Sequence, residues 1–195
     1  MTVMLAEPIV RSVTGGCSAR RGAWVRLLVR AGGRGAARGA GGGGSGRWAH
    51  SRAGNRVGCR TAWLAYGAAA GSRVVIDTVE RDEELAALAA QADWPSPVRV
   101  HSGDAEGLLA TLGSYELIFA DAEGGKWTGL DRTIAALRPG GTLVVDDMDP
   151  ARYTEAAHLA AVAEVRRRLL TDPRLIAAEL PAATGLILVT RRAFA

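Results

Sequence analysis

The sequence is poor in cysteine, in aromatic residues and in lysine. Its 195 residues include 2 cysteines and a single lysine, Lys126, and aromatic residues make up 5% of the chain. Cys17 and Cys59 form neither a disulfide framework nor a metal-binding pattern, so we expect free thiols. No uninterrupted apolar run approaches the length of a membrane span, and no secretory signal precedes Arg11. We therefore expect a cytoplasmic protein that does not contact a membrane.

Acidic residues are almost absent from the first 60 residues. This stretch holds 11 arginines and one acid, Glu7, for a net charge of +10, whereas residues 61–195 carry −6. Its glycine runs make it a poor helix and a poor strand, and only residues 24–29 could pack. We expect an atypical, poorly ordered Arg/Gly-rich region at residues 1–60, followed by one α/β domain at residues 61–195. Binding of nucleic acid by the basic region is an alternative function, although few aromatic residues are interleaved there to stack on bases.

A βαβ pattern at residues 114–148 organises the second part of the chain. Two short apolar runs, at residues 115–120 and 142–145, flank a segment with helical periodicity that the sequence RPGG ends. Both runs are followed by carboxylates: Asp121 after the first, and Asp146 and Asp147 after the second. Continuous apolar strands indicate a parallel sheet, where ligands bind beyond the carboxyl ends of the strands. The aspartates are therefore candidates for a binding site.

Helices and strands alternate on both sides of this unit. We expect helices at residues 61–70, 82–92, 105–112 and 155–170, and strands at residues 73–79, 98–101, 175–180 and 185–190. The connection between the last two strands is too short for a crossover, so they should pair antiparallel. The predicted fold class is α/β, with a doubly wound, mostly parallel sheet and a C-terminal antiparallel hairpin.

Five segments occur in unbroken order between Thr61 and Arg192: TAWLA, VIDTVERD, VHSGDA, ELIFADAEGGKW and LRPGGTLVVDDM. With the order of elements, they resemble the class I S-adenosylmethionine-dependent methyltransferases, most of all the O-methyltransferase group of catechol and caffeoyl-CoA type. The resemblance implies a Rossmann-like fold, S-adenosylmethionine (SAM) as cofactor and a small-molecule hydroxyl as methyl acceptor. Related enzymes often dimerise, so a homodimer is also implied. A Rossmann-like, NAD-dependent oxidoreductase is the alternative enzyme, because an acid at a strand end can also hold the ribose of NAD.

The resemblance also implies which residues bind the cofactor. Glu80 ends the second expected strand and would accept hydrogen bonds from both ribose hydroxyls, unless it is an exposed acid of the ERDEE run. Asp104, with Ala105, resembles the residue that faces the adenine amino group, and it would also serve as a helix N-cap. Asp121 is a further cofactor-binding candidate.

Three aspartates match positions that hold a divalent cation in the metal-dependent members of the group. Asp121, Asp146 and Asp147 stand where Asp, Asp and Asn are usual, and hard oxygen ligands suit Mg²⁺. The alternative is that they bond the cofactor or the backbone. The implied catalytic residues are Asp121 and Lys126, because related enzymes have a lysine after the first of these aspartates that takes the substrate's proton. Here residues 123–125 lengthen the spacing, and a solvated loop cation is the alternative.

The glycine-rich loop expected after the first strand departs from the family pattern. Three positions within residues 54–61 match the cofactor-binding loop: Gly54, Gly58 and Thr61. Arg56 and Arg60, however, stand where glycine is expected, and no apolar strand directly precedes them. A one-base shift of GC-rich codons for this segment would read T-G-S-G-A-G-T, which restores the loop. We hypothesise that much of residues 14–60 is a frame-shifted translation, which resequencing of the gene would test.

Overall fold

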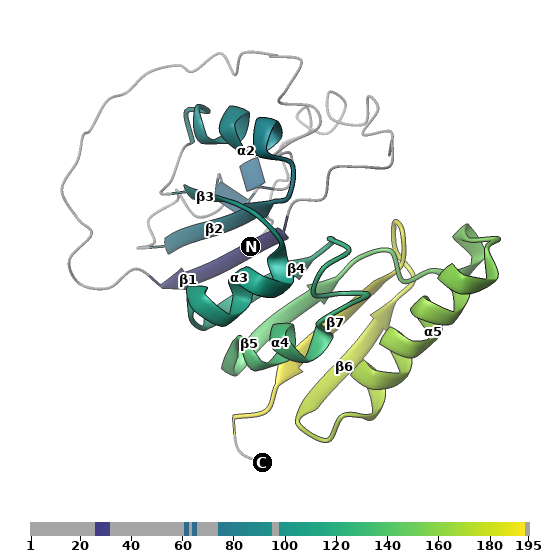
Figure 1. The fold of residues 1–195 in the computed structure, drawn as a ribbon. Helices are drawn as coiled ribbons and strands as arrows, with labels where there is room; N and C mark the ends of the chain where they lie inside the picture. The colour runs from purple at the N-terminus through teal and green to yellow at the C-terminus, as the bar shows by residue number, and fades with distance from the viewer. Residues whose placement is uncertain (1–25, 32–60, 63, 66–73, 95–97, 194–195) are drawn as a thin grey trace, which may run out of the picture.

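The computed structural model describes residues 26–31, 61–62, 64–65, 74–94 and 98–193. Within them the chain forms one seven-stranded sheet with the order β3-β2-β1-β4-β5-β7-β6 (Figure 1). The strands are β1 (Arg26–Ala31), β2 (Val74–Glu80), β3 (Val98–Ser102), β4 (Tyr115–Ala120), β5 (Leu137–Val145), β6 (Leu175–Leu180) and β7 (Leu186–Arg191). Every strand predicted after residue 61 is present.

Five of the seven strands point the same way, and β1 and β7 run against them. β2 pairs parallel with β3, and β4 pairs parallel with β5. At the other end of the sheet β7 is antiparallel to both β5 and β6, and the β6–β7 ladder runs from Leu175–Arg191 to Leu180–Leu186. The predicted α/β sheet with a C-terminal antiparallel hairpin is confirmed.

The first strand differs from the doubly wound pattern in its direction. β1 lies in the middle of the sheet and is antiparallel to both of its neighbours, with Arg26 opposite Val79 and Ala31 opposite Val74 of β2. Its last residue therefore lies at the amino end of β2. In the Arg/Gly-rich region only residues 24–29 were expected to pack, and β1 arises from this one aliphatic run. The rest of residues 1–60 lies outside the described residues, so the predicted poorly ordered region and its boundary stay predictions.

Helices α3, α4 and α5 cover one face of the sheet (Figure 1), where Ile118, Leu143 and Ile187 are fully buried in the main hydrophobic core. The helices are α2 (Glu83–Ala90), α3 (Ala105–Leu112), α4 (Leu130–Ala135) and α5 (Ala156–Thr171), with a short 3₁₀ helix, η2 (Pro150–Arg152). Residues 61–62 and 64–65 are helical, as predicted, and the remainder of that helix lies outside the described residues. None of the helices in the described part of the chain combines the length and the apolar character needed to cross a membrane.

The RPGG segment was expected to be a turn between a helix and a strand, and this prediction was wrong in one respect. β5 already begins at Leu137, which lies opposite Tyr115, and the next pair joins Leu117 to Thr142. Residues 138–141 therefore bulge out of the ladder within the strand. A Cβ atom on Gly141 would lie 2.8 Å from the carbonyl oxygen of Arg138, so only glycine fits there without a shift. The glycines therefore allow β5 to resume its pairing with β4 after the bulge, and they do not mark the start of the strand.

Candidate functional site

Acidic side chains gather where the carboxyl ends of β2, β3, β4 and β5 meet. Glu80 ends β2, Asp104 begins the helix after β3, Asp121 follows β4 and Asp146 follows β5. Glu80 and Asp121 are each 1% exposed, and Asp146 is 6% exposed. Carboxylates withdrawn from water to this extent need hydrogen-bond donors or cations nearby. The edge of the sheet is therefore a candidate binding site, as the sequence predicted.

Glu80 is buried, so the alternative of an exposed surface acid is wrong. Its Oε1 accepts a hydrogen bond of 3.0 Å from the backbone N–H of Asp82. Its Oε2 is also buried and has no hydrogen-bond partner among the described residues. Burial raises the pKa of the Glu80 carboxyl above its ordinary value, and the backbone N–H groups of Asp82 and Arg81 oppose this shift only in part. A buried carboxylate oxygen that lacks a hydrogen-bond donor fits a ligand with a hydroxyl group that can donate to it.

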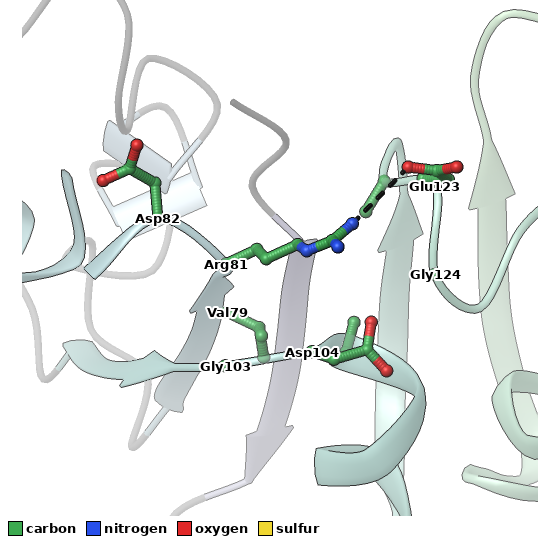
Figure 2. A pocket seen from close by; sticks show the side chains of 9 residues that line it. Val79, Arg81, Asp82, Gly103, Asp104, Glu123 and Gly124 are labelled. Atoms are coloured by element: carbon green, nitrogen blue, oxygen red, sulfur yellow. Dashed lines mark ion pairs between the residues drawn. The ribbon is translucent and has the colours of Figure 1, made fainter. Parts of the chain in front are cut away.

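A cavity of about 400 Å³ lies at this edge of the sheet, and the two chain neighbours of Glu80, Val79 and Arg81, line it. Its wall comes from the carboxyl ends of three parallel strands and the segments that follow them: Val79, Arg81 and Asp82 at the end of β2; Gly103, Asp104 and Ala105 after β3; Ala122, Glu123 and Gly124 after β4. Figure 2 shows the Arg81 side chain reaching across toward Glu123. Arg81 Nη1 lies 3.8 Å from Glu123 Oε2. This volume is in the range of small-molecule and cofactor sites.

Asp104 serves as the helix cap that the sequence predicted, and it also faces the cavity. Its Oδ2 accepts a hydrogen bond of 3.2 Å from the backbone N–H of Gly107 at the start of α3. The segment after β4 approaches Asp104 closely. A Cβ atom on Gly124 would lie only 2.7 Å from Asp104 Oδ1. Ala105 is buried in the wall behind it, at 6% exposure.

The predicted glycine loop is described at one position only. Thr61 is fully buried, and its Oγ1 lies 3.4 Å from Oγ1 of Thr78 on β2. Gly54 and Gly58 lie outside the described residues. Cofactor binding by these three residues stays a prediction.

The three aspartates predicted to hold a cation do come together. One carboxylate oxygen from each of Asp121, Asp146 and Asp147 lies within 4.8 Å of the others. Asp147 has a positive φ of 64°, which is uncommon outside glycine, and its N–H donates a 2.8 Å hydrogen bond to Asp146 Oδ1. The same oxygen of Asp146 accepts a hydrogen bond from the hydroxyl of Thr184. The donor set is all carboxylate oxygen, which suits a hard divalent cation such as Mg²⁺.

Lys126 enters this acidic cluster from the loop after β4 and is not a solvated cation. Its side chain is 1% exposed, and Nζ donates hydrogen bonds of 3.1 Å to Asp147 Oδ2 and to the carbonyl oxygen of Asp146. Nζ also lies 4.5 Å from the centroid of the Trp127 ring. The sequence correctly placed Lys126 near the aspartates, but it did not indicate that Asp147 would be its partner.

An aromatic cluster beside Lys126 was not anticipated from the sequence. Tyr153 donates a 3.2 Å hydrogen bond to the carbonyl oxygen of Asp147 and stacks on His158 with ring centroids 4.1 Å apart. Trp127 meets the same His158 edge-on at 5.1 Å. Burial raises the pKa of Tyr153 to about 12, with the negative charge of Asp147 adding to the effect. The signal was available in the position of Trp127 directly after the only lysine, in a chain with few aromatic residues.

Comparison with solved structures gives a consistent set of similar proteins. The cofactor-bound protein Rv0187 from MTB is similar with a TM-score of 0.58 and 26% identity, over 68% of this chain and 67% of that chain. The O-methyltransferase from Bacillus cereus in complex with SAH has a TM-score of 0.57 and 20% identity, over 68% of each chain. The O-methyltransferase TomG from Streptomyces achromogenes, in complex with SAM, has a TM-score of 0.54 and 21% identity, over 68% of this chain and 67% of that chain. No protein-family model matches the sequence, and no curated protein matches it.

Proposed function

Because the chain has the fold of the class I O-methyltransferases, we propose that it is a SAM-dependent O-methyltransferase acting on the hydroxyl of a small molecule. The observation that carries the proposal is the buried Oε2 of Glu80, which has no hydrogen-bond partner among the described residues, on a residue whose two chain neighbours, Val79 and Arg81, line a cavity of about 400 Å³. A ribose supplies two neighbouring hydroxyl donors, which is the chemistry that this carboxylate lacks.

The chain's residues fit the nucleoside part of SAM in the following way. Glu80 would hold the ribose, and Asp104 would face the adenine amino group across the cavity. Gly124 leaves room there, because a side chain at this position would touch Asp104. When bound, SAM supplies a methyl group that its sulfonium has already activated, so alignment with the acceptor oxygen is the main demand on the protein.

The acceptor hydroxyl would lie near Asp121 and Lys126, on the side of the aromatic cluster. Both described hydrogen-bond partners of Lys126 Nζ are acceptors, so the amine is the donor in both contacts. In this arrangement Lys126 would stabilise an ionised acceptor oxygen by its charge. Its predicted role as the base that removes the proton stays a prediction. Asp121, Asp146 and Asp147 would hold a divalent cation, which would lower the pKa of the acceptor hydroxyl.

Binding of radiolabelled SAM and of NAD to the full chain, measured by equilibrium dialysis, tests the proposal. We expect SAM to bind and NAD not to bind. Replacing Glu80 with Gln removes the charge that strengthens the ribose hydrogen bonds and should weaken SAM binding by about tenfold or more.

Glu116→Gln is the matched control for this experiment. Glu116 lies near the amino end of β4, away from the site, where it pairs with Arg138. This variant should bind SAM as the natural chain does. Binding of NAD without SAM would replace the proposal with the oxidoreductase alternative.

A further inference from the structure

Lys126 brings a positive charge into the acidic cluster from within the chain. Its side chain is 1% exposed, and Nζ lies 3.1 Å from Asp147 Oδ2. A buried ammonium is stable only when paired with acceptors, so these contacts define where it must lie. We propose that Lys126 is a tethered cation that competes with a divalent metal ion for the Asp147 carboxylate and thereby weakens metal binding.

The backbone holds Asp147 in this arrangement. Its N–H is bonded to Asp146 Oδ1 at 2.8 Å, and its carbonyl oxygen accepts a hydrogen bond of 3.2 Å from the Tyr153 hydroxyl. With the peptide groups on both sides held, the carboxylate cannot move toward a metal ion by a shift of the chain. A metal ion that uses Asp147 must therefore bind the carboxylate whose Oδ2 already accepts a hydrogen bond from Lys126.

The charges of the cluster predict the direction of the effect. The three carboxylates and Lys126 together carry a formal charge of −2, and removal of the lysine charge would leave −3. A divalent ion among the carboxylates would also lie close to the ammonium, and like charges withdrawn from water repel one another with little screening. Loss of the lysine charge should therefore strengthen metal binding rather than weaken it.

Titration of the full chain with Mn²⁺, followed by the electron paramagnetic resonance signal of the free ion, tests the inference. We expect Lys126→Met to bind Mn²⁺ at least tenfold more tightly than the natural chain. Arg132→Met removes an exposed cation that pairs with Glu106 and should leave Mn²⁺ affinity within twofold. Equal or weaker Mn²⁺ binding by Lys126→Met would overturn the inference.

A second variant covers the case in which Lys126→Met fails to fold. Lys126→Gln removes the charge but keeps a polar side chain that can donate a hydrogen bond, so it should show the same tenfold gain in a chain that melts cooperatively. The inference concerns the site of the proposed function, but its test needs neither SAM nor an acceptor. Failure of methyl transfer would therefore leave this result unaffected, and unchanged Mn²⁺ affinity in Lys126→Gln would remove the inference alone.

Discussion

Glu80 is a carboxyl group whose burial opposes its own ionisation. Since burial raises its pKa in the folded chain, the protonated form is favoured by folding. The stability that Glu80 contributes is therefore fully present at acidic pH, below the pKa of an unfolded glutamate, and is lost as the pH rises through the folded pKa. Glu80 thus provides a residue for ligand binding, but its burial lowers the stability of the ligand-free protein.

We predict that Glu80→Gln stabilises the ligand-free chain at pH 8 and not at pH 4. Glutamine keeps the acceptor for the Asp82 N–H and removes the buried charge, so the gain at pH 8 should be about 1 kcal/mol, the order of a buried unsatisfied polar group. Urea unfolding at both pH values measures it. In Glu116→Gln, which changes an exposed carboxylate, no gain should appear at pH 8, and a pH-independent gain in Glu80→Gln would contradict the account.

The bulge within β5 depends on glycine at one position. A Cβ on Gly141 would meet the carbonyl oxygens of Arg138 at 2.8 Å and Tyr115 at 3.0 Å. Both are backbone atoms of the strand pair that positions Asp121 and Asp146, so neither can move without disturbing the ladder. Strand β5, which positions Asp146, therefore depends on Gly141, a residue that is not part of the candidate site.

Gly141→Ala should destabilise the chain by about 1–3 kcal/mol, because the added methyl group overpacks a site that is already filled. Gly107 is the matched control, since a Cβ there meets nothing within 4 Å and the residue lies inside α3. Gly107→Ala should be stabilising by about 0.5–1 kcal/mol through helix propensity. The two variants are compared by urea unfolding at pH 7, and equal stability of Gly141→Ala and the natural chain would show that the bulge can relax.

The direction of β1 matters for the molecule as a whole. The carboxyl ends of β2, β3, β4 and β5 share the edge that carries Glu80, Asp121 and Asp146, whereas the carboxyl end of β1 lies at the opposite edge. In doubly wound folds, the loop after the central strand supplies the glycines that let backbone approach the cofactor. In the sequence Arg56 and Arg60 stand where the family pattern has glycine, and both lie outside the described residues.

Restoring the loop should therefore strengthen SAM binding. Five substitutions convert residues 54–61 to GTGSGAGT: Asn55→Thr, Arg56→Gly, Val57→Ser, Cys59→Ala and Arg60→Gly. We expect the natural chain to bind SAM weakly and the restored chain to bind it with a Kd on the order of micromolar, measured by calorimetry. If both chains bind equally, the loop hypothesis is wrong and the natural segment is sufficient.

Much of the fold was determined by local sequence. Apolar runs of strand length, helical periodicity and caps such as Asp82 and Asp104 depend on residues within a few positions of one another. The short connection before Gly185 likewise required an antiparallel hairpin, whatever lies around it. Acids at the ends of β2, β4 and β5 could be assigned to one edge of the sheet, because parallel strands bring their carboxyl ends together.

Only the tertiary structure decided the details of the site, because these depend on contacts between residues far apart in the chain. The burial of Glu80, the meeting of Lys126 with Asp147 and the stacking of Tyr153 on His158 each arise where separate loops pack together. The antiparallel direction of β1 is likewise set by pairing with β2 and β4, since a single aliphatic run fits a sheet in either direction. Composition and periodicity contain no information about such pairings.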